Sequence, residues 1–155
     1  MKILLTAIGT KMPTWVSSGV LEYQKRLPKE FSIEVKEIPL AHRGKTASVQ
    51  QAKDQEAEKI LSTVQEKQCV VALDSRGKQW NTEQLAEQIE KWQMDGRDLN
   101  FLVGGPDGLS QKCIQRADTV WSLSALTLPH PLVRVVIVEQ LYRAWSLLNN
   151  HPYHK

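Results

Sequence analysis

Residues 2–9, with the sequence KILLTAIG, form an almost continuous apolar run at the start of the chain. This pattern is typical of a strand that is buried on both faces, as in a parallel sheet covered by helices. Similar short runs occur at residues 69–73 (CVVAL) and 99–103 (LNFLV), and strand-like segments occur at residues 31–38 and 119–123. We therefore predict five strands, with residues 2–9 forming a central one.

Amphipathic segments separate these strands. Pro13 can begin a helix that stops at Pro28, and Asn81 with Gln84 resembles a capping box that opens a later helix. The alternation of strands and helices favours an α/β fold with a parallel sheet. The predicted helices span residues 13–27, 47–67, 82–95, 110–117 and 131–148.

The composition is that of one globular domain. The 155 residues are 41% apolar and 24% charged, with no linker or repeat, so we expect a single domain over residues 1–155. The net charge of +3 permits an anionic partner without requiring one. Cys69 and Cys113 are far apart and follow no secretory leader, which favours a reduced, cytoplasmic protein. Prolines and charges interrupt the apolar stretch 123–138, so we expect no membrane span.

The last predicted helix is apolar on more than one side. Leu132, Val135, Val138 and Leu147 lie outside the main apolar stripe and are apolar as well. A sheet covers only one side of a helix, so this pattern favours a homodimer in which a second copy covers another side. The alternative is a monomer whose core encloses the helix.

Several signatures of other enzyme classes are incomplete. The first strand leads into Gly9-Thr10-Lys11 rather than a G-x-G-x-x-G loop, and Gly44-Lys45-Thr46 lacks the first P-loop glycine because Pro39 occupies its position. The histidines and cysteines do not have the spacing of metal ligands, so we expect no metal. Ser122 and Ser124 lack the glycines of a nucleophile elbow.

Three loops at the carboxyl ends of predicted strands form the best candidate site, because open α/β sheets bind ligands there. They begin at Asp74-Ser75-Arg76-Gly77, at Gly104-Gly105-Pro106-Asp107-Gly108, and at residues 122–131 (SLSALTLPHP). The paired glycines let a ligand approach the backbone, and the third loop suits an apolar pocket for a purine ring. Alternatively, the glycines form a tight turn and residues 123–128 are a core strand.

Two polar segments each have two interpretations. His42, Arg43 and Lys45 form either a solvated basic turn or a contact for an anion or RNA. The C-terminal residues 149–155 (NNHPYHK) are either a frayed end or a source of stacking and hydrogen bonds to a nucleobase, with Arg143 touching phosphate.

The three loops, together with Arg43-Gly44-Lys45 and Tyr142-Arg143-Ala144-Trp145, closely resemble the RlmH family of SPOUT-class ribosomal RNA methyltransferases over essentially the whole chain. Residues 121–134 are the most specific part. The resemblance implies a three-layer α/β fold with a C-terminal trefoil knot, a homodimer, and S-adenosylmethionine as methyl donor. The implied substrate is a pseudouridine in a stem-loop of large-subunit ribosomal RNA, methylated at N3 in the assembled ribosome.

The resemblance also implies which residues bind the cofactor, and they fall on the three loops described above. Gly105 adjoins them and is included as a candidate. The cofactor residues are Leu73, Gly104, Leu123, Ser124, Ala125, Leu126, Thr127 and Leu128.

Methylation at N3 requires the imide proton to leave. The resemblance assigns no residue to this step. We expect the C-terminal tail (residues 149–155) of one subunit to cap the cofactor pocket of the other. Candidates for removing or orienting the proton are His154, Tyr153 and His130. Candidates for stabilising negative charge on the uracil oxygens are Arg134, Arg143 and Lys155.

Two rival functions explain less of the sequence. A non-catalytic RNA-binding module would leave the three-loop pocket without a role, and binding of S-adenosylmethionine distinguishes the two. A small-molecule hydrolase or reductase would need a nucleophile, metal or dinucleotide signature that the sequence lacks.

Overall fold

The computed structural model describes residues 1–44 and 48–154. Two 3-10 helices, η1 (Lys29–Phe31) and η2 (Pro152–His154), accompany the main elements. The strands are β1 (Lys2–Ile8), β2 (Ser32–Ile38), β3 (Cys69–Gln79), β4 (Leu99–Val103) and β5 (Thr119–Ser122). The α-helices are α1 (Thr14–Gln24), α2 (Val49–Ser62), α3 (Thr82–Asp95), α4 (Gln111–Arg116) and α5 (His130–Leu148).

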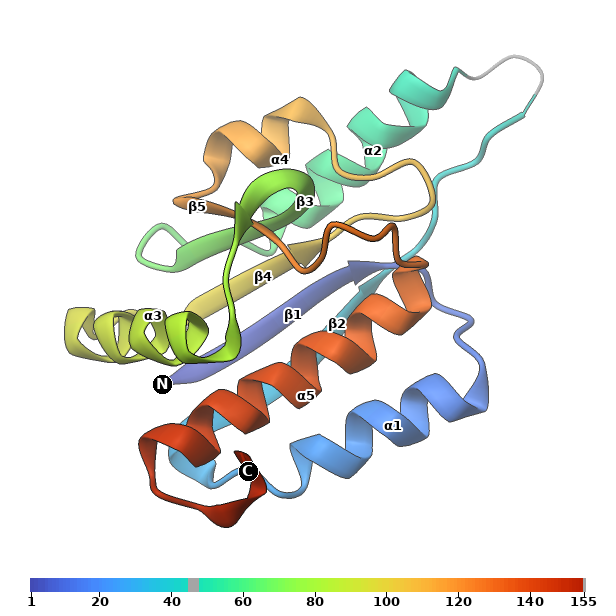
Figure 1. The fold of residues 1–155 in the computed structure, drawn as a ribbon. Helices are drawn as coiled ribbons and strands as arrows, with labels where there is room; N and C mark the ends of the chain where they lie inside the picture. The colour runs from blue at the N-terminus through green and yellow to red at the C-terminus, as the bar shows by residue number, and fades with distance from the viewer. Residues whose placement is uncertain (45–47, 155) are drawn as a thin grey trace.

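The predicted α/β fold with a parallel sheet is confirmed. All strand pairs are parallel, and the strand order is β2-β1-β4-β3-β5, so β1 is an inner strand. Helices α1, α3 and α5 cover one face of the sheet, and α2 and α4 cover the other (Figure 1). This arrangement explains the apolar runs in the sequence, since the inner strands are buried from both sides.

Three elements differ from the prediction by more than one residue at a boundary. Helix α1 ends at Gln24 because the amides of Arg26 and Leu27 bond to carbonyls only three residues earlier, which closes the α-helix before Pro28. Helix α2 begins at Val49 because Ser48 and Gln51 form a reciprocal capping box, and it ends at Ser62. The third predicted strand continues to Gln79.

The extension of β3, residues 74–79, lies very close to the backbone of its neighbour β5. Leu73 and Lys78 both pair with Trp121, so residues 74–77 form an irregularity between two stretches of pairing. A Cβ atom on Gly77 would lie 2.6 Å from the backbone carbonyl of Val120. Glycine is therefore required where the chain passes from the cavity wall back to the sheet.

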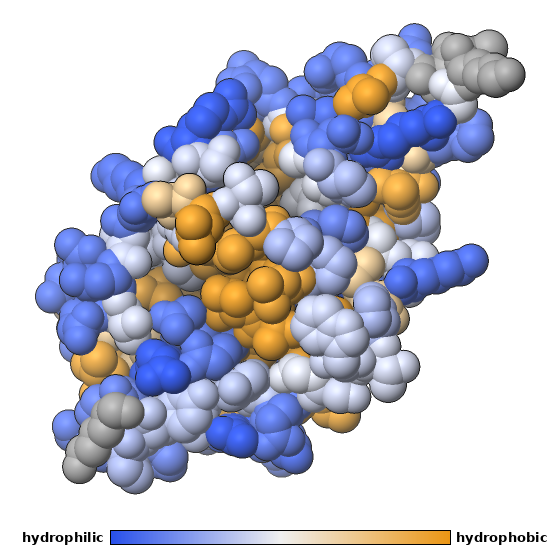
Figure 2. All heavy atoms as spheres, turned by 45° about the vertical axis from the view of Figure 1, so that its right-hand side comes forward, coloured by the Kyte–Doolittle hydropathy of each residue, from blue (hydrophilic) through white to orange (hydrophobic). Residues whose placement is uncertain are grey.

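Helix α5 is only partly covered by its own chain. Ile137 and Leu141 are fully buried, whereas Leu132, Val133 and Val136 remain partly exposed. On the face shown in Figure 2, apolar side chains form a continuous area framed by polar ones. Within the described residues, no helix is long and apolar enough to cross a membrane.

Candidate functional site

A cavity of about 920 Å³ opens at the carboxyl ends of β3, β4 and β5, which are neighbours in the sheet. This volume lies in the range of pockets for small molecules and cofactors. All three strand-end loops line it, as expected. Ala125 is not part of the cavity wall. The expected cofactor residues that line it are Leu73, Gly104, Gly105, Leu123, Ser124, Leu126, Thr127 and Leu128.

The wall also contains residues that the sequence analysis did not select. Trp121, the last residue of β5 but one, lines the cavity and stacks on Trp80 with ring centroids 5.4 Å apart. Lys53 reaches the wall from α2. Periodicity could not identify Lys53, because nothing in the sequence shows that this side of α2 faces the strand ends.

Asp74 brings a negative charge to the cavity wall. Its carboxylate accepts hydrogen bonds from the side chain of Arg76, at 2.9 Å, and from the amide of the same residue, at 2.8 Å. The side-chain hydrogen bond is the main cause of a lowered pKa for Asp74, so this carboxylate is ionised at neutral pH. Lys53, Arg76 and Asp107 line the wall as well, so the wall carries two groups of each charge.

The loop that contains Gly104 and Gly105 requires glycine for a structural reason, apart from any ligand. A Cβ atom on Gly104 would lie 2.5 Å from the carbonyl carbon of Gly108. The amide of Gly108 donates to the carbonyl oxygen of Gly105 at 3.0 Å, and Gly108 has φ +78°. The tight-turn interpretation is therefore correct for this loop, and the loop lines the cavity as well.

Arg134 holds the sheet and is not free to act on a substrate. Its side chain is 3% exposed and donates to the carbonyl oxygens of Ile8 (3.2 Å) and Gly9 (2.7 Å). It also pairs with Glu37 at 2.7 Å. Nη1 and Nη2 of Arg134 therefore bind the ends of β1 and β2, and its Nε is buried without a partner among the described residues, so the structure gives Arg134 a structural role instead of the expected one at the uracil oxygens.

His130 is the one expected catalytic candidate that lines the cavity, among the residues that the structure describes. Burial, and then the charge of Arg134, lower the pKa of His130, so its imidazole is neutral at pH 7. Its Nδ1 atom is buried and finds no hydrogen-bond partner within residues 1–44 and 48–154. A neutral imidazole at the wall of the cavity suits proton abstraction.

The lowered pKa of His130 predicts a pH-dependent loss of stability. The unfolded chain binds a proton at His130 near pH 6.5, whereas the folded chain does so only at lower pH, so the free energy of unfolding falls as pH drops below about 6.5. We expect His130→Asn to remove this contribution. Thermal unfolding of both proteins between about pH 5 and 7.5 should show the variant gaining relative stability as pH falls. A difference that stays constant with pH would contradict the prediction.

Arg143, Tyr153 and His154 lie away from this cavity. Arg143 is in the last turns of α5, and the tail follows that helix, whose 19 residues span about 28 Å from the cavity wall at His130. None of the three appears in the described cavity wall. Within one chain, the structure therefore does not bring these candidates to the site.

The tail packs against its own chain through Tyr153. Its hydroxyl donates to Glu139 at 3.0 Å, and Arg143 lies over its ring, 4.9 Å from the centroid. Burial, followed by hydrogen bonds to Tyr23 and Glu139, raises the pKa of Tyr153, so the phenol is protonated and acts as a donor in this position. Lys155 lies outside the described residues.

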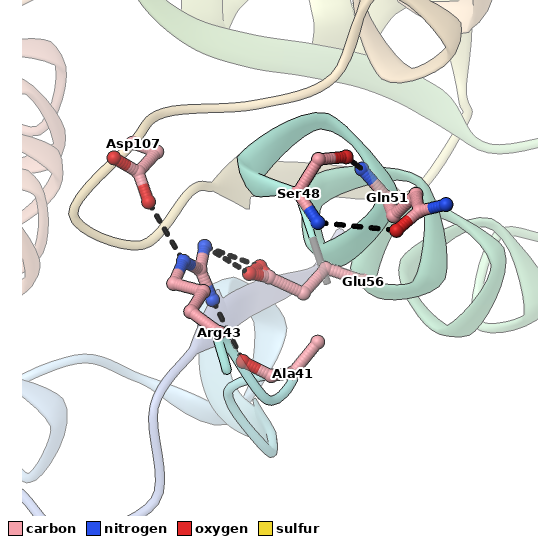
Figure 3. Close-up of polar contacts among 6 residues, drawn as sticks. All are labelled: Ala41, Arg43, Ser48, Gln51, Glu56 and Asp107. Carbon is pink, nitrogen blue, oxygen red and sulfur yellow. Dashed lines mark hydrogen bonds and ion pairs between the residues drawn. The ribbon is translucent and has the colours of Figure 1, made fainter. Parts of the chain in front are cut away.

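The basic turn before α2 is not simply solvated. Arg43 pairs with Glu56 and Asp107, both at 2.7 Å, whereas His42 is exposed and Lys45 lies outside the described part of the chain (Figure 3). No cluster of three or more His, Cys, Asp or Glu side chains that could hold a metal occurs among the residues described.

Solved structures with a similar fold include a probable methylase family protein from Haemophilus influenzae Rd KW20. It matches with a TM-score of 0.56 over 99% of this chain and 70% of that chain, at 13% sequence identity. At this low identity, the match supports the fold alone.

Full-length relatives give a more specific match. The chain is 52% identical to the ribosomal RNA large subunit methyltransferase H of Marinomonas sp. and 55% identical to that of Saccharophagus degradans, with 100% of each chain covered. A family model described as a predicted SPOUT methyltransferase matches residues 1–154. The expected family and enzyme class are thereby confirmed: this chain belongs to the SPOUT methyltransferases.

Proposed function

We propose that this protein transfers a methyl group from S-adenosylmethionine to large-subunit ribosomal RNA in the cytoplasm. The observation that carries the proposal is the cavity formed by three strand-end loops in a chain of this family. The full-length relatives are named as methyltransferases of this RNA.

The cavity wall fits S-adenosylmethionine. Leu73, Leu126 and Leu128 offer apolar surface for a purine ring, while Lys53 and Asp74 match the two charges of an amino-acid group. The strand-end loops also expose backbone groups for hydrogen bonds. When bound, the cofactor supplies an activated methyl group on a positively charged sulfur.

Within this reaction, we propose N3 of a pseudouridine in the assembled ribosome as the methylated atom. The N3 proton has to be removed for the nitrogen lone pair to attack, and the neutral imidazole of His130 is placed to accept it at the cavity wall. The cavity positions the reacting groups and thereby contributes much of the rate.

A second copy of the chain would complete the site. Leu132, Val133 and Val136 of α5 are partly exposed apolar residues, and Val133 lines the cavity, so α5 offers apolar surface beside the cavity wall. In a twofold dimer formed through this surface, the tail of one subunit caps the cavity of the other. This arrangement gives Arg143, Tyr153 and His154 access to a substrate that they cannot reach in their own subunit.

Transfer of a labelled methyl group tests the proposed function. Purified protein is incubated with methyl-labelled S-adenosylmethionine and with ribosomes from cells that lack the enzyme. The large-subunit RNA is then separated from the small-subunit RNA. We expect label in the large-subunit RNA only. Label in the small-subunit RNA would contradict the proposed substrate. So would the absence of label from both RNAs when the protein binds S-adenosylmethionine.

A pocket-filling variant provides the control for this experiment. Thr127 lines the cavity and is exposed, so Thr127→Trp places an indole against the cavity without disturbing the core. We expect Thr127→Trp to weaken binding of S-adenosylmethionine at least about tenfold, as expected when a side chain occupies part of a ligand's space. Isothermal titration calorimetry measures this, and unchanged affinity would place the cofactor elsewhere.

A further inference from the structure

We infer that Arg43 is a positioning residue for the cofactor cavity: acting through Asp107, it holds the Gly104–Gly108 loop in its binding conformation. This inference rests on the proposed function, because it takes the cavity to be the site of S-adenosylmethionine. Arg43 itself is not part of the described cavity wall, whereas Asp107 is.

The Arg43 guanidinium joins three separate parts of the chain (Figure 3). Its Nε donates to Oδ2 of Asp107 at 2.7 Å, and its Nη2 donates to Oε1 of Glu56 at 2.7 Å. Its Nη1 donates to the carbonyl oxygen of Ala41 at 2.9 Å. A planar fork with fixed donors fits three acceptors in this way, and a lysine ammonium does not.

Glu56 fixes the guanidinium in place. The Glu56 side chain is only 3% exposed, although it lies on α2, a helix rich in Gln, Glu and Lys. A buried carboxylate needs a cationic partner, and Arg43 provides it. Burial opposes the charge of Arg43, but the hydrogen bonds to Glu56 and Asp107 outweigh it and raise the Arg43 pKa.

The loop that Asp107 belongs to needs such an anchor. It contains Gly104, Gly105 and Gly108, and glycine loses more conformational freedom on ordering than any other residue. The hydrogen bond from Gly108 to Gly105 closes the turn on itself, but it does not fix the turn relative to the rest of the molecule. The buried Leu109 holds one end of the turn, and the ion pair of Asp107 with Arg43 connects its exposed side to α2 through Glu56.

The position of Asp107 indicates which property depends on the ion pair. The Asp107 side chain is 35% exposed, so breaking this pair leaves no buried charge and has little effect on folding. A loop that is ordered before binding avoids the entropic cost of ordering when the ligand arrives. Loss of the pair should therefore weaken cofactor binding more than it weakens the fold.

Asp107→Asn is the primary test, because it removes the pair and leaves Arg43 bound to Glu56. We expect the Kd and KM for S-adenosylmethionine to rise about fivefold, the upper size expected for a partly exposed ion pair. The kcat at saturating cofactor and the KM for RNA should stay within about twofold, because the reacting groups are untouched. Asp95→Asn, which breaks the 2.8 Å pair with Arg97 at the end of α3, is the matched control and should change neither constant.

Arg43→Lys completes the test. Lysine keeps the charge beside Glu56 but lacks the fork that reaches Asp107, so it should match Asp107→Asn in cofactor affinity, and the double variant should be no weaker than either single one. Additive losses would show that Asp107 contacts the cofactor directly and would overturn the inference. A rise confined to the KM for RNA would overturn it too, by placing Arg43 at the substrate.

The two proposals fail in distinguishable ways. If the unmodified protein does not bind S-adenosylmethionine, the proposed function is wrong. If it binds and Asp107→Asn binds equally well, only the positioning role is wrong.

Discussion

Removal of Tyr153, His154 and Lys155 is expected to abolish methylation and to leave binding of S-adenosylmethionine intact. The structure places Tyr153 and His154 after the far end of α5, about 28 Å along the helix from the cavity wall at His130. They lie outside the described wall of their own cavity, so deleting them removes no cofactor contact within the subunit. Retention of full activity would contradict any catalytic role of the tail.

Mixing the truncated chain with Thr127→Trp, at a concentration of S-adenosylmethionine too low to fill the Thr127→Trp cavity, tests whether the tail acts on the partner's site. The truncated chain keeps its cavity, and Thr127→Trp keeps its tail. After unfolding and refolding together in equal amounts, half of the dimers are mixed, and each mixed dimer has one site with both intact parts. We expect about a quarter of the native activity to return. A tail that acts only in its own subunit would restore none.

Replacement of Gly77 by alanine is expected to destabilise the protein by more than about 3 kcal/mol, above the usual cost of overpacking. The added Cβ atom would lie 2.6 Å from the backbone carbonyl of Val120 and 2.7 Å from the amide of Trp121. Backbone atoms in a paired strand cannot move aside as a flexible side chain does. The extension of β3 must separate from β5, and the cavity wall at Trp121 is disturbed with it.

Two other glycines serve as controls for this prediction. Gly96 ends α3 with φ +74° and open space around it, so alanine there costs only the left-handed conformation, about 1 kcal/mol. Gly19 lies inside α1, where a Cβ would be 3.4 Å from Val135 methyl groups, and alanine there gains helix propensity. Urea unfolding of the three variants should rank Gly77→Ala as clearly the least stable. If Gly77→Ala loses no more unfolding free energy than Gly96→Ala, the close approach of Gly77 to the backbone of β5 is contradicted.

The sequence predicts the cores of the strands and the place of the cavity well. Residues 69–73 and 99–103 are apolar because both faces of the inner strands are covered, and this signal is local. The ends of parallel strands meet at one edge of a sheet, which is why three loops separated in sequence line one cavity.

What could not be predicted depends on contacts between distant parts of the chain. The polar residues 74–79 continue β3 only because they pair again with β5. Glu56 and Arg134 have the composition of surface residues and are buried because each meets a partner far away in sequence. The trefoil knot that membership of the family implies leaves no trace in periodicity, and the rarity of knots argued against it.

For the same reason, only some of the catalytic candidates lie at the cavity. His130 is close to the strand-end loops in sequence and does line the cavity. Arg143 and the tail are candidates by their chemistry alone, and one chain places them toward the other end of α5. Their proposed role depends on the proposed surface between two copies, which a single sequence does not describe.

The most direct test of the proposed reaction is the identity of the methylated atom. Ribosomes from cells lacking the enzyme are incubated with purified protein and S-adenosylmethionine, and the large-subunit RNA is digested and analysed by mass spectrometry. The account predicts one new 3-methylpseudouridine, and much less of it in the reaction with Thr127→Trp at the same low cofactor concentration. A methyl group on any other nucleoside or atom, or on the small-subunit RNA, would contradict it.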